Sequence, residues 1–314
     1  MKKGKALLTA IALSMFVSAS AFAGNAKDFF QNTSMTVSTN YNPNGLPTNT
    51  DDVRLTSSAT ALRITAGSVT AESLTVQNGL SYTIANATST STNSTLTLGN
   101  PSGFTNTFSG VGNDLIALSA NSNLTIQGPN ASTGSGTLRL VLASNGNFNV
   151  ASGSSLTITS VISGAFSISK TGGGTATFGA ANTYSGGTTI DAGTLIANAD
   201  GALGTGNVSL TGGNVTLTLQ NGAVNDYIAD SATLSYINTD VINLNFTGTD
   251  TVAGLIVDGV AQAPGVYGAS ATNPDGAFTG TGTITVVPEP ATLAMMGLGA
   301  GLLAGVRRFR RKLR

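Results

Sequence analysis

The 314-residue chain contains no histidine, no cysteine and no tryptophan. Without histidine, nucleophile systems of the Ser-His-Asp and Cys-His types lack their general base. Without cysteine there is no disulfide, and a structural zinc site loses both of its usual ligands. The absence of tryptophan weakens the case for a cleft that stacks on sugars, although six tyrosines remain. We therefore expect no metal, no cofactor and no catalytic residue.

Charged residues are scarce, at 9% of the chain, and unevenly placed. Nine of the 14 Lys and Arg lie in two terminal segments, residues 1–23 and 288–314. Residues 24–287 keep five cations against 13 acidic residues, which gives this part a net charge of −8. Because binding to nucleic acid requires clustered cations, this composition excludes a nucleic-acid partner.

Residues 1–23 have the pattern of a secretory signal peptide. An apolar run at residues 6–17 follows a positively charged start, and Ala21 and Ala23 form an A-x-A cleavage site that leaves Gly24 as the mature N-terminus. The positive charges are Lys2, Lys3 and Lys5. This pattern predicts export through the secretion translocon and cleavage by signal peptidase. The apolar run is too short for a spanning helix.

The C-terminal segment, residues 288–314, has three parts. Pro288-Glu289-Pro290 precede an apolar run at residues 291–306, which as a helix would span about 24 Å. This is short of the usual ~20 residues, so we expect flanking arginines to snorkel and the bilayer to thin around a transmembrane helix. A basic end follows, which we expect to stay in the cytoplasm: Arg307, Arg308, Arg310, Arg311, Lys312 and Arg314.

This three-part segment resembles the PEP-CTERM sorting signal, and Pro288-Glu289-Pro290 matches its motif. The resemblance implies that the helix holds an exported protein transiently in the inner membrane. An exosortase, a membrane-embedded transpeptidase-like protease, then cuts near the motif. The alternative is a permanent C-terminal anchor that is not cut.

Short segments of alternating apolar and polar residues recur between residues 52 and 219, separated by Gly, Asn and Ser. This alternation is typical of strands with one buried face. The spacing suits a sandwich or a solenoid. Typical triplets are Leu74-Thr75-Val76, Leu96-Thr97-Leu98, Leu124-Thr125-Ile126 and Leu156-Thr157-Ile158.

Residues 156–210 resemble the autotransporter-associated β-strand repeat of passenger domains, most closely in the run Asn182-Thr183-Tyr184-Ser185-Gly186-Gly187-Thr188-Thr189-Ile190. The resemblance implies an all-β fold, a right-handed parallel β-helix, which we assign to residues 24–230. Coils of roughly 20 residues would give on the order of ten turns. We assign residues 231–287 to a β cap, because Asp258-Gly259 predict a hairpin with a type I′ turn.

Two segments are weak site candidates. Gly186–Asp191 partly match a calcium-binding nonapeptide, but a second copy is missing and we interpret the segment as a turn. Asp51-Asp52 form an adjacent acidic pair that could bind calcium or serve a glycosidase. We interpret this pair as part of a solvated loop.

These observations together predict a non-enzymatic structural protein of the cell surface or extracellular matrix, and the resemblance to the PEP-CTERM signal implies that it is associated with exopolysaccharide. One alternative is an adhesin that binds carbohydrate or neighbouring cells. Another is a polysaccharide lyase or hydrolase built on the same scaffold. Such an enzyme needs several convergent acidic and cationic side chains, and five cations in residues 24–287 make that set hard to assemble.

Overall fold

The computed structural model describes residues 25–29, 34–36, 40–42, 44–56, 61–64, 67–86, 93–128 and 136–287. The predicted signal peptide and sorting segment lie outside these ranges. Within them, no helix has both the length and the apolar character needed to cross a membrane.

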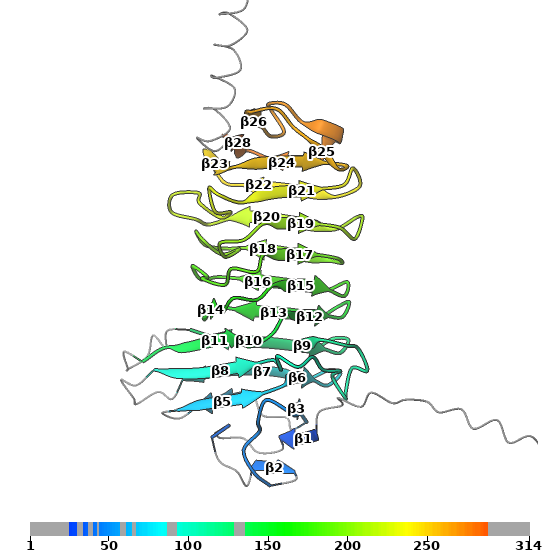
Figure 1. The fold of residues 1–314 in the computed structure, drawn as a ribbon, viewed down its shortest axis with the longest axis vertical. Helices are drawn as coiled ribbons and strands as arrows, with labels where there is room; N and C mark the ends of the chain where they lie inside the picture. Colours follow the sequence, from blue (N-terminus) through cyan, green and yellow to red (C-terminus); the bar gives the residue numbers. More distant parts are fainter. Residues whose placement is uncertain are drawn as a thin grey trace, which may run out of the picture.

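The described residues form four sheets of short strands. Within the sheets, the strands follow one another along the long axis of the molecule (Figure 1). The first sheet contains, in spatial order, β2 (Tyr41–Asn42), β1 (Asn25–Phe29), β3 (Asp51–Leu55), β6 (Ser73–Val76), β9 (Asp114–Leu118), β12 (Gly146–Val150), β15 (Ile168–Thr171), β17 (Thr188–Ile190), β19 (Val208–Leu210), β21 (Thr233–Tyr236), β24 (Gly254–Val257) and β25 (Val260–Ala261).

The second sheet contains β27 (Phe278–Gly280), β22 (Val241–Asn245), β20 (Thr216–Gln220), β18 (Thr194–Ala197), β16 (Thr175–Phe178), β13 (Ser155–Ile158), β10 (Asn123–Gln127), β7 (Ser81–Asn86) and β4 (Ala61–Ile64). The third contains β14 (Val161–Ser163), β11 (Leu138–Leu142), β8 (Ser94–Leu98) and β5 (Ser68–Ala71). The fourth contains β23 (Thr249–Val252), β28 (Thr283–Val286) and β26 (Gly265–Tyr267), and a short 3-10 helix, η2 (Pro274–Gly276), precedes β27.

Parallel pairing dominates the described strands. Every pair in the second and third sheets is parallel, for example β10 with β13 and β11 with β8. In the first sheet only β2 and β25 pair antiparallel with their neighbours. The fold is therefore all-β, with parallel sheets consistent with a β-helix, as the repeat implied. Its right-handedness stays a prediction.

The coil length varies along the stack. Ile168, Thr188 and Val208 are partners in successive coils, 20 residues apart, as expected from the repeat. Leu74 and Ile116 are also partners, but the chain between them is twice as long because it includes β7, β8 and the segment around residues 100–113. The repeat length thus holds only in the later coils.

Inward positions form columns of apolar side chains. One column of the second sheet joins, through successive in-register pairs, Leu124, Leu156, Ala176, Leu195, Leu217, Ile242 and Phe278. All of them are buried. The alternation in the triplets therefore correctly predicts which side chains form the core.

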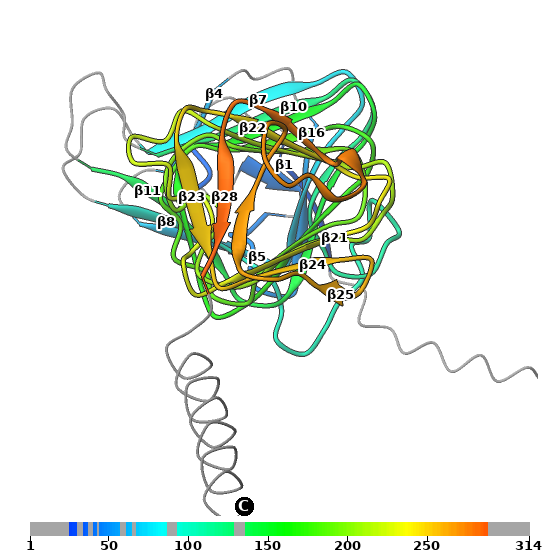
Figure 2. The ribbon, with the colours of Figure 1, turned by 90° about the horizontal axis from the view of Figure 1, so that it is seen from above.

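The C-terminal end is closed by antiparallel strands. β24 and β25 form the predicted hairpin, with Asp258 (φ 49°) and Gly259 (φ 77°) in its two-residue turn, as a type I′ turn requires. Figure 2 shows β28 lying over the ring of coils, and β26 pairs antiparallel with it. Parallel pairing crosses residue 230, between β19 and β21 and between β20 and β22, so the division between body and cap at that point stays a prediction.

Candidate functional site

The repeat motif begins with Asn182, a side chain that joins three coils. Its Oδ1 accepts a hydrogen bond from the Ile162 amide at 2.8 Å, and its Nδ2 donates to the Ala202 carbonyl at 2.6 Å. Asn182 is buried, and Ile162 belongs to β14, the last strand of the third sheet. The asparagine thus continues backbone pairing where the strands of that sheet stop.

Tyr184 fills the core beside this asparagine. Its hydroxyl lies 2.5 Å from Oγ1 of Thr188, which also donates to the Leu203 carbonyl at 3.2 Å. Burial raises the pKa of the Tyr184 hydroxyl above its usual range. The tyrosine is therefore a core side chain, and it offers no surface to a ligand.

The glycines of the motif permit close packing of coil on coil. A Cβ on Gly186 would lie 2.2 Å from the carbonyl carbon of Phe166, and Gly187 has a φ of +91°. Asp191, the acidic position of the calcium-like pattern, accepts a hydrogen bond from Thr211 Oγ1 in the next coil. Among the described residues no group of three or more acidic side chains could hold a metal ion.

Lys170 occupies an inward position in the first sheet, between Phe148 and Ile190. Its ammonium group donates to three carbonyl oxygens, of Thr171 at 2.8 Å, Gly172 at 2.7 Å and Ala192 at 3.0 Å. Burial lowers the pKa of Lys170 to about 8.

The sequence argument missed this buried lysine. Lysine is rarely placed in a core, and composition alone assigns it to the surface. The alternation Ile168-Ser169-Lys170 was the available signal, because it places Lys170 on the same face of the strand as Ile168.

The interpretation of Asp51-Asp52 as a solvated loop is wrong. Both residues lie in β3 and are buried. Asp51 Oδ2 accepts hydrogen bonds from the amide and the hydroxyl of Thr48, at 2.8 and 2.7 Å. Asp52 accepts from Ser73 Oγ and, at 2.6 Å, from the Thr107 amide. The segment around Thr107 covers this strand, so the two carboxylates are structural acceptors.

Glu72 lies beside these two aspartates and is also buried. Its Oε1 accepts a hydrogen bond from Asn100 Nδ2 at 2.7 Å, whereas Oε2 has no partner in the described part of the chain. Burial raises the pKa of Glu72, and the charges of Asp52 and Asp51 raise it further.

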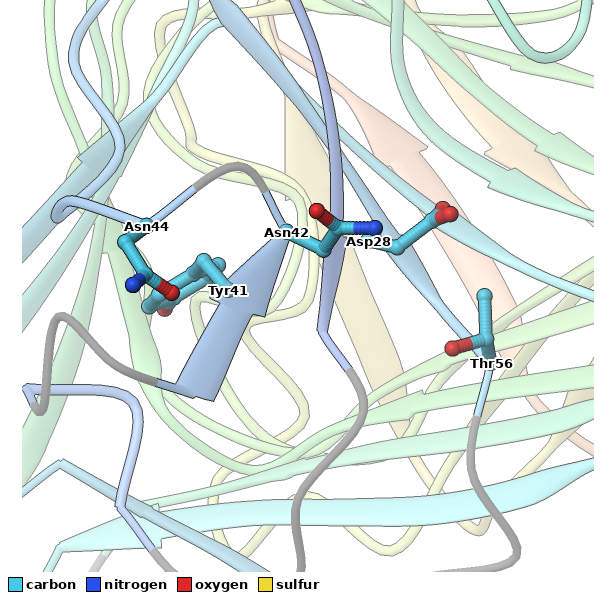
Figure 3. Close-up of a pocket in the computed structure, with 5 residues that line it drawn as sticks. All are labelled: Asp28, Tyr41, Asn42, Asn44 and Thr56. Carbon is cyan, nitrogen blue, oxygen red and sulfur yellow. The ribbon is translucent and has the colours of Figure 1, made fainter.

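A pocket of about 290 Å³ lies near the N-terminal end of the stack (Figure 3). Its lining residues are Asp28, Tyr41, Asn42, Asn44 and Thr56.

The charged and aromatic groups of this pocket already have partners. Asp28 forms an ion pair with Arg54 at 2.7 Å, and the Arg54 guanidinium lies 4.5 Å from the ring centroid of Phe108. Tyr41 donates its hydroxyl to the Met35 carbonyl at 2.8 Å, and its buried ring packs edge-on against Phe29. The pocket therefore offers amide and hydroxyl groups and no exposed aromatic face.

The described part of the chain leads directly up to the Pro288-Glu289-Pro290 motif. The Val287 amide donates to the Val252 carbonyl at 3.0 Å, and β28 just before it pairs with β23 on one side and β26 on the other. Pro288 is the next residue.

The predicted processing residues lie outside the described ranges. They are Ala21, Ala23 and Gly24 at the signal cleavage site, Pro288, Glu289 and Pro290 in the motif, and Arg307, Arg308, Arg310, Arg311, Lys312 and Arg314 at the basic end.

Comparison with known families identifies two segments. Residues 168–197 match the family model of the passenger-associated-transport repeat, and residues 286–312 match the PEP-CTERM protein-sorting motif. Both matches confirm the resemblances drawn from the sequence. No curated protein matches the chain, and no solved structure matches it either. The sorting motif indicates an exported protein that is sorted through the membrane, and it implies processing by an exosortase.

Proposed function

We propose that this chain is a non-enzymatic structural component of the cell surface or extracellular matrix. It is exported, held transiently in the inner membrane, cut by an exosortase and associated with exopolysaccharide. One observation carries the proposal. Among the described residues a stack of coils runs as far as Val287, and the Pro288-Glu289-Pro290 motif begins at the next residue. The described residues thus form a rod that leads directly into a sorting motif.

The placement of acidic and cationic side chains supports a structural role. Both members of the candidate glycosidase pair accept hydrogen bonds within the protein, Asp51 from Thr48 and Asp52 from Ser73 and Thr107. Among the cations, Lys170 is enclosed by carbonyl groups and Arg54 is paired with Asp28. A lyase or hydrolase needs such groups to converge on an open cleft.

An adhesin is the second candidate function, and the pocket in Figure 3 favours it. Asn42, Asn44 and Thr56 carry amide and hydroxyl groups of the kind that recognise sugar hydroxyls. Because the aromatic ring of Tyr41 is buried, stacking on a sugar ring is not available there.

Processing at both ends is the first prediction. Mass spectrometry of protein recovered from the cell surface should find an N-terminus at Gly24 and no peptide beyond about Pro290. A strain without exosortase should retain the peptide that ends in Arg314 and keep the protein in the membrane fraction. An intact C-terminus in the surface pool of the wild-type strain would leave only the permanent anchor.

The absence of catalysis is tested with purified protein. The full chain, purified in detergent, should release neither reducing nor unsaturated sugars from the exopolysaccharide of the producing cell. Sugar release that is lost in the Asp52→Asn variant, while the fold is retained, would instead assign an enzyme.

A further inference from the structure

The outward face of the second sheet from β7 to β27, beyond the terminal strand β4 with its Arg63, differs from the first sheet because it has no charge. Eight consecutive strands, from β7 through β27, contain no Asp, Glu, Lys or Arg. By contrast, the first sheet carries outward Arg54, Asp191 and Asp258 on its strands or directly after them. An uncharged face is notable in a chain whose residues 24–287 have a net charge of −8.

Threonine hydroxyls form two columns on this face. The first column joins Thr83, Thr125, Thr157 and Thr177 as partners in successive strands and, after Ile196, reaches Thr218. The second column joins Thr175, Thr194 and Thr216. Neighbouring threonines of one column are about 4.8 Å apart along the rod, and the columns are about 6.6 Å apart. We call these eight side chains the threonine face: Thr83, Thr125, Thr157, Thr175, Thr177, Thr194, Thr216 and Thr218.

The hydroxyls of the threonine face make no hydrogen bond to other side chains or to backbone in the described part of the chain. Several outward hydroxyls of the first sheet are different. Ser235 Oγ donates to Ser209 Oγ at 2.9 Å, and Thr211 Oγ1 donates to Asp191. Thr75 donates to Asn106 at 3.3 Å. These hydroxyls are paired within the protein, whereas all eight hydroxyls of the threonine face are left for another partner.

Thr218 is the least exposed residue of the threonine face, at 8%. Its hydroxyl has no hydrogen-bond partner among the described residues, and its oxygen is not one of the fully buried atoms that lack a partner. The hydroxyl is therefore open to a group from outside that supplies the bond. Its place in the outward column directs that bond away from the core.

The size of the face argues against a second copy of this chain as its occupant. The eight strands cover about 34 Å, and two columns with their side chains cover about 13 Å, so the face offers roughly 450 Å². Stable protein interfaces bury about 800 Å² from each partner. A narrow, extended ligand that runs along the rod fits these dimensions better.

We propose that the threonine face binds an extended, neutral polysaccharide lying along the axis of the stack. Each coil presents the same hydroxyl pair, and a polymer of hydroxylated units presents repeated acceptors and donors to it. Many weak hydrogen bonds then add up along one chain. The acidic rod repels anionic polymers, so the ligand is neutral. This deepens the proposed matrix role, and it rests on the surface location proposed above.

The experiment measures retardation of the full chain, purified in detergent, in native gels that contain a polymer. A soluble neutral β-glucan should retard the wild-type protein, and polygalacturonate should not. The triple variant Thr125→Val, Thr157→Val, Thr177→Val removes three hydroxyls and keeps the side-chain shape. It should raise the apparent Kd for β-glucan about tenfold, since each hydrogen bond contributes modestly.

The matched control makes the same chemical change on other faces, as Thr95→Val, Thr97→Val and Thr189→Val, and should bind like the wild type. Both triple variants should show wild-type melting temperatures, because outward Thr→Val preserves strand propensity. β-Glucan fragments should bind more weakly as their length falls below that of the face.

Four results would each overturn the proposal: no retardation of the wild-type protein by β-glucan, equal retardation by polygalacturonate, unchanged binding by the first triple variant, or loss of self-association alone in that variant. The last result would identify the threonine face as a contact between copies. None of these results affects the test of processing at Gly24 and Pro290, so the proposed function is tested independently of the threonine face.

Discussion

At the scale of single residues, the direction of a side chain in its strand decides its role more than its chemical type does. Ile190 and Lys170 are partners in adjacent coils and both are buried, although one is apolar and the other charged. The lysine is accommodated because three carbonyl oxygens surround its ammonium group. Alternation was therefore the better guide to burial here, and composition the poorer one.

Ile190 gives the sharpest test of inward placement. The Ile190→Asp variant puts an unpaired carboxylate into the core, so its free energy of unfolding should fall by several kcal/mol, or folding should fail. Asn198→Asp is the control. The Asn198 Oδ1 accepts hydrogen bonds from Gln220 and Asn221, and an aspartate oxygen accepts the same bonds. Thermal melts that show equal tolerance of both changes would contradict inward placement.

Lys170 predicts a specific dependence of stability on pH. Its pKa is about 8 in the folded protein and 10.5 as the reference value, so the unfolded chain binds more protons between these values. Stability relative to a Lys170→Met variant should therefore rise as the pH increases from about 8 to about 10.5.

Urea midpoints of both proteins across this range measure the difference. The comparison between the two proteins cancels the ionisation of tyrosines. Arg139→Met, a change at an exposed cation, should show no such trend against the wild type. A difference in urea midpoint between wild type and Lys170→Met that does not change with pH would show that burial does not lower the pKa of Lys170.

At the scale of elements, Asn182, Tyr184 and Gly186 of the repeat make the contacts between one coil and the next. The run from Asn182 to Ile190 replaces a strand of the third sheet by side-chain hydrogen bonds, from Asn182 to Ile162 and Ala202. The repeat could be found from sequence because these requirements are local. A glycine must stand where Gly186 meets the backbone of the preceding coil.

Asn182 tests this element. Asn182→Ala leaves the Ile162 amide and the Ala202 carbonyl without their partner, which should cost about 2–4 kcal/mol and lower the melting temperature. Thr183→Ala is the control, because the neighbouring Thr183 is exposed and its change should be nearly neutral. Similar melting temperatures for the two variants would mean that the bridge through Asn182 contributes nothing.

Other elements could not be derived from the sequence. The hairpin of β24 and β25 followed from Asp258-Gly259, since a type I′ turn needs two residues with positive φ. The burial of Asp51 and Asp52 did not follow, because it depends on Thr107, 55 residues beyond Asp52. No local pattern in a strand shows which distant segment covers it.

At the scale of the whole molecule, charge is divided along the rod. Residues 171–287 contain eight aspartates and no Lys or Arg, whereas residues 24–170 contain five acidic and five basic residues. Several of these aspartates bind backbone amides between coils. Asp240 accepts from Val215, and Asp250 accepts from Tyr227 and Ile228. The acidity of this half is thus partly structural.

Repulsion within this half predicts a response to salt. Raising NaCl from about 10 mM to 500 mM should increase the melting temperature, because exposed like charges are screened over a Debye length. A variant with Asp191→Asn and Asp230→Asn, two exposed positions, should show a smaller increase. A melting temperature that is independent of salt, or that falls in both proteins, would contradict this account.

The place of β28 directly before the sorting segment has a mechanical consequence. β28 is the middle strand of its sheet, parallel to β23 and antiparallel to β26, and the sorting segment continues directly from it. Tension applied through that segment acts along β28, so the hydrogen bonds on both flanks are loaded together in shear and cannot be peeled one at a time. A chain held at this point can transmit a pull to the whole stack before any single coil opens.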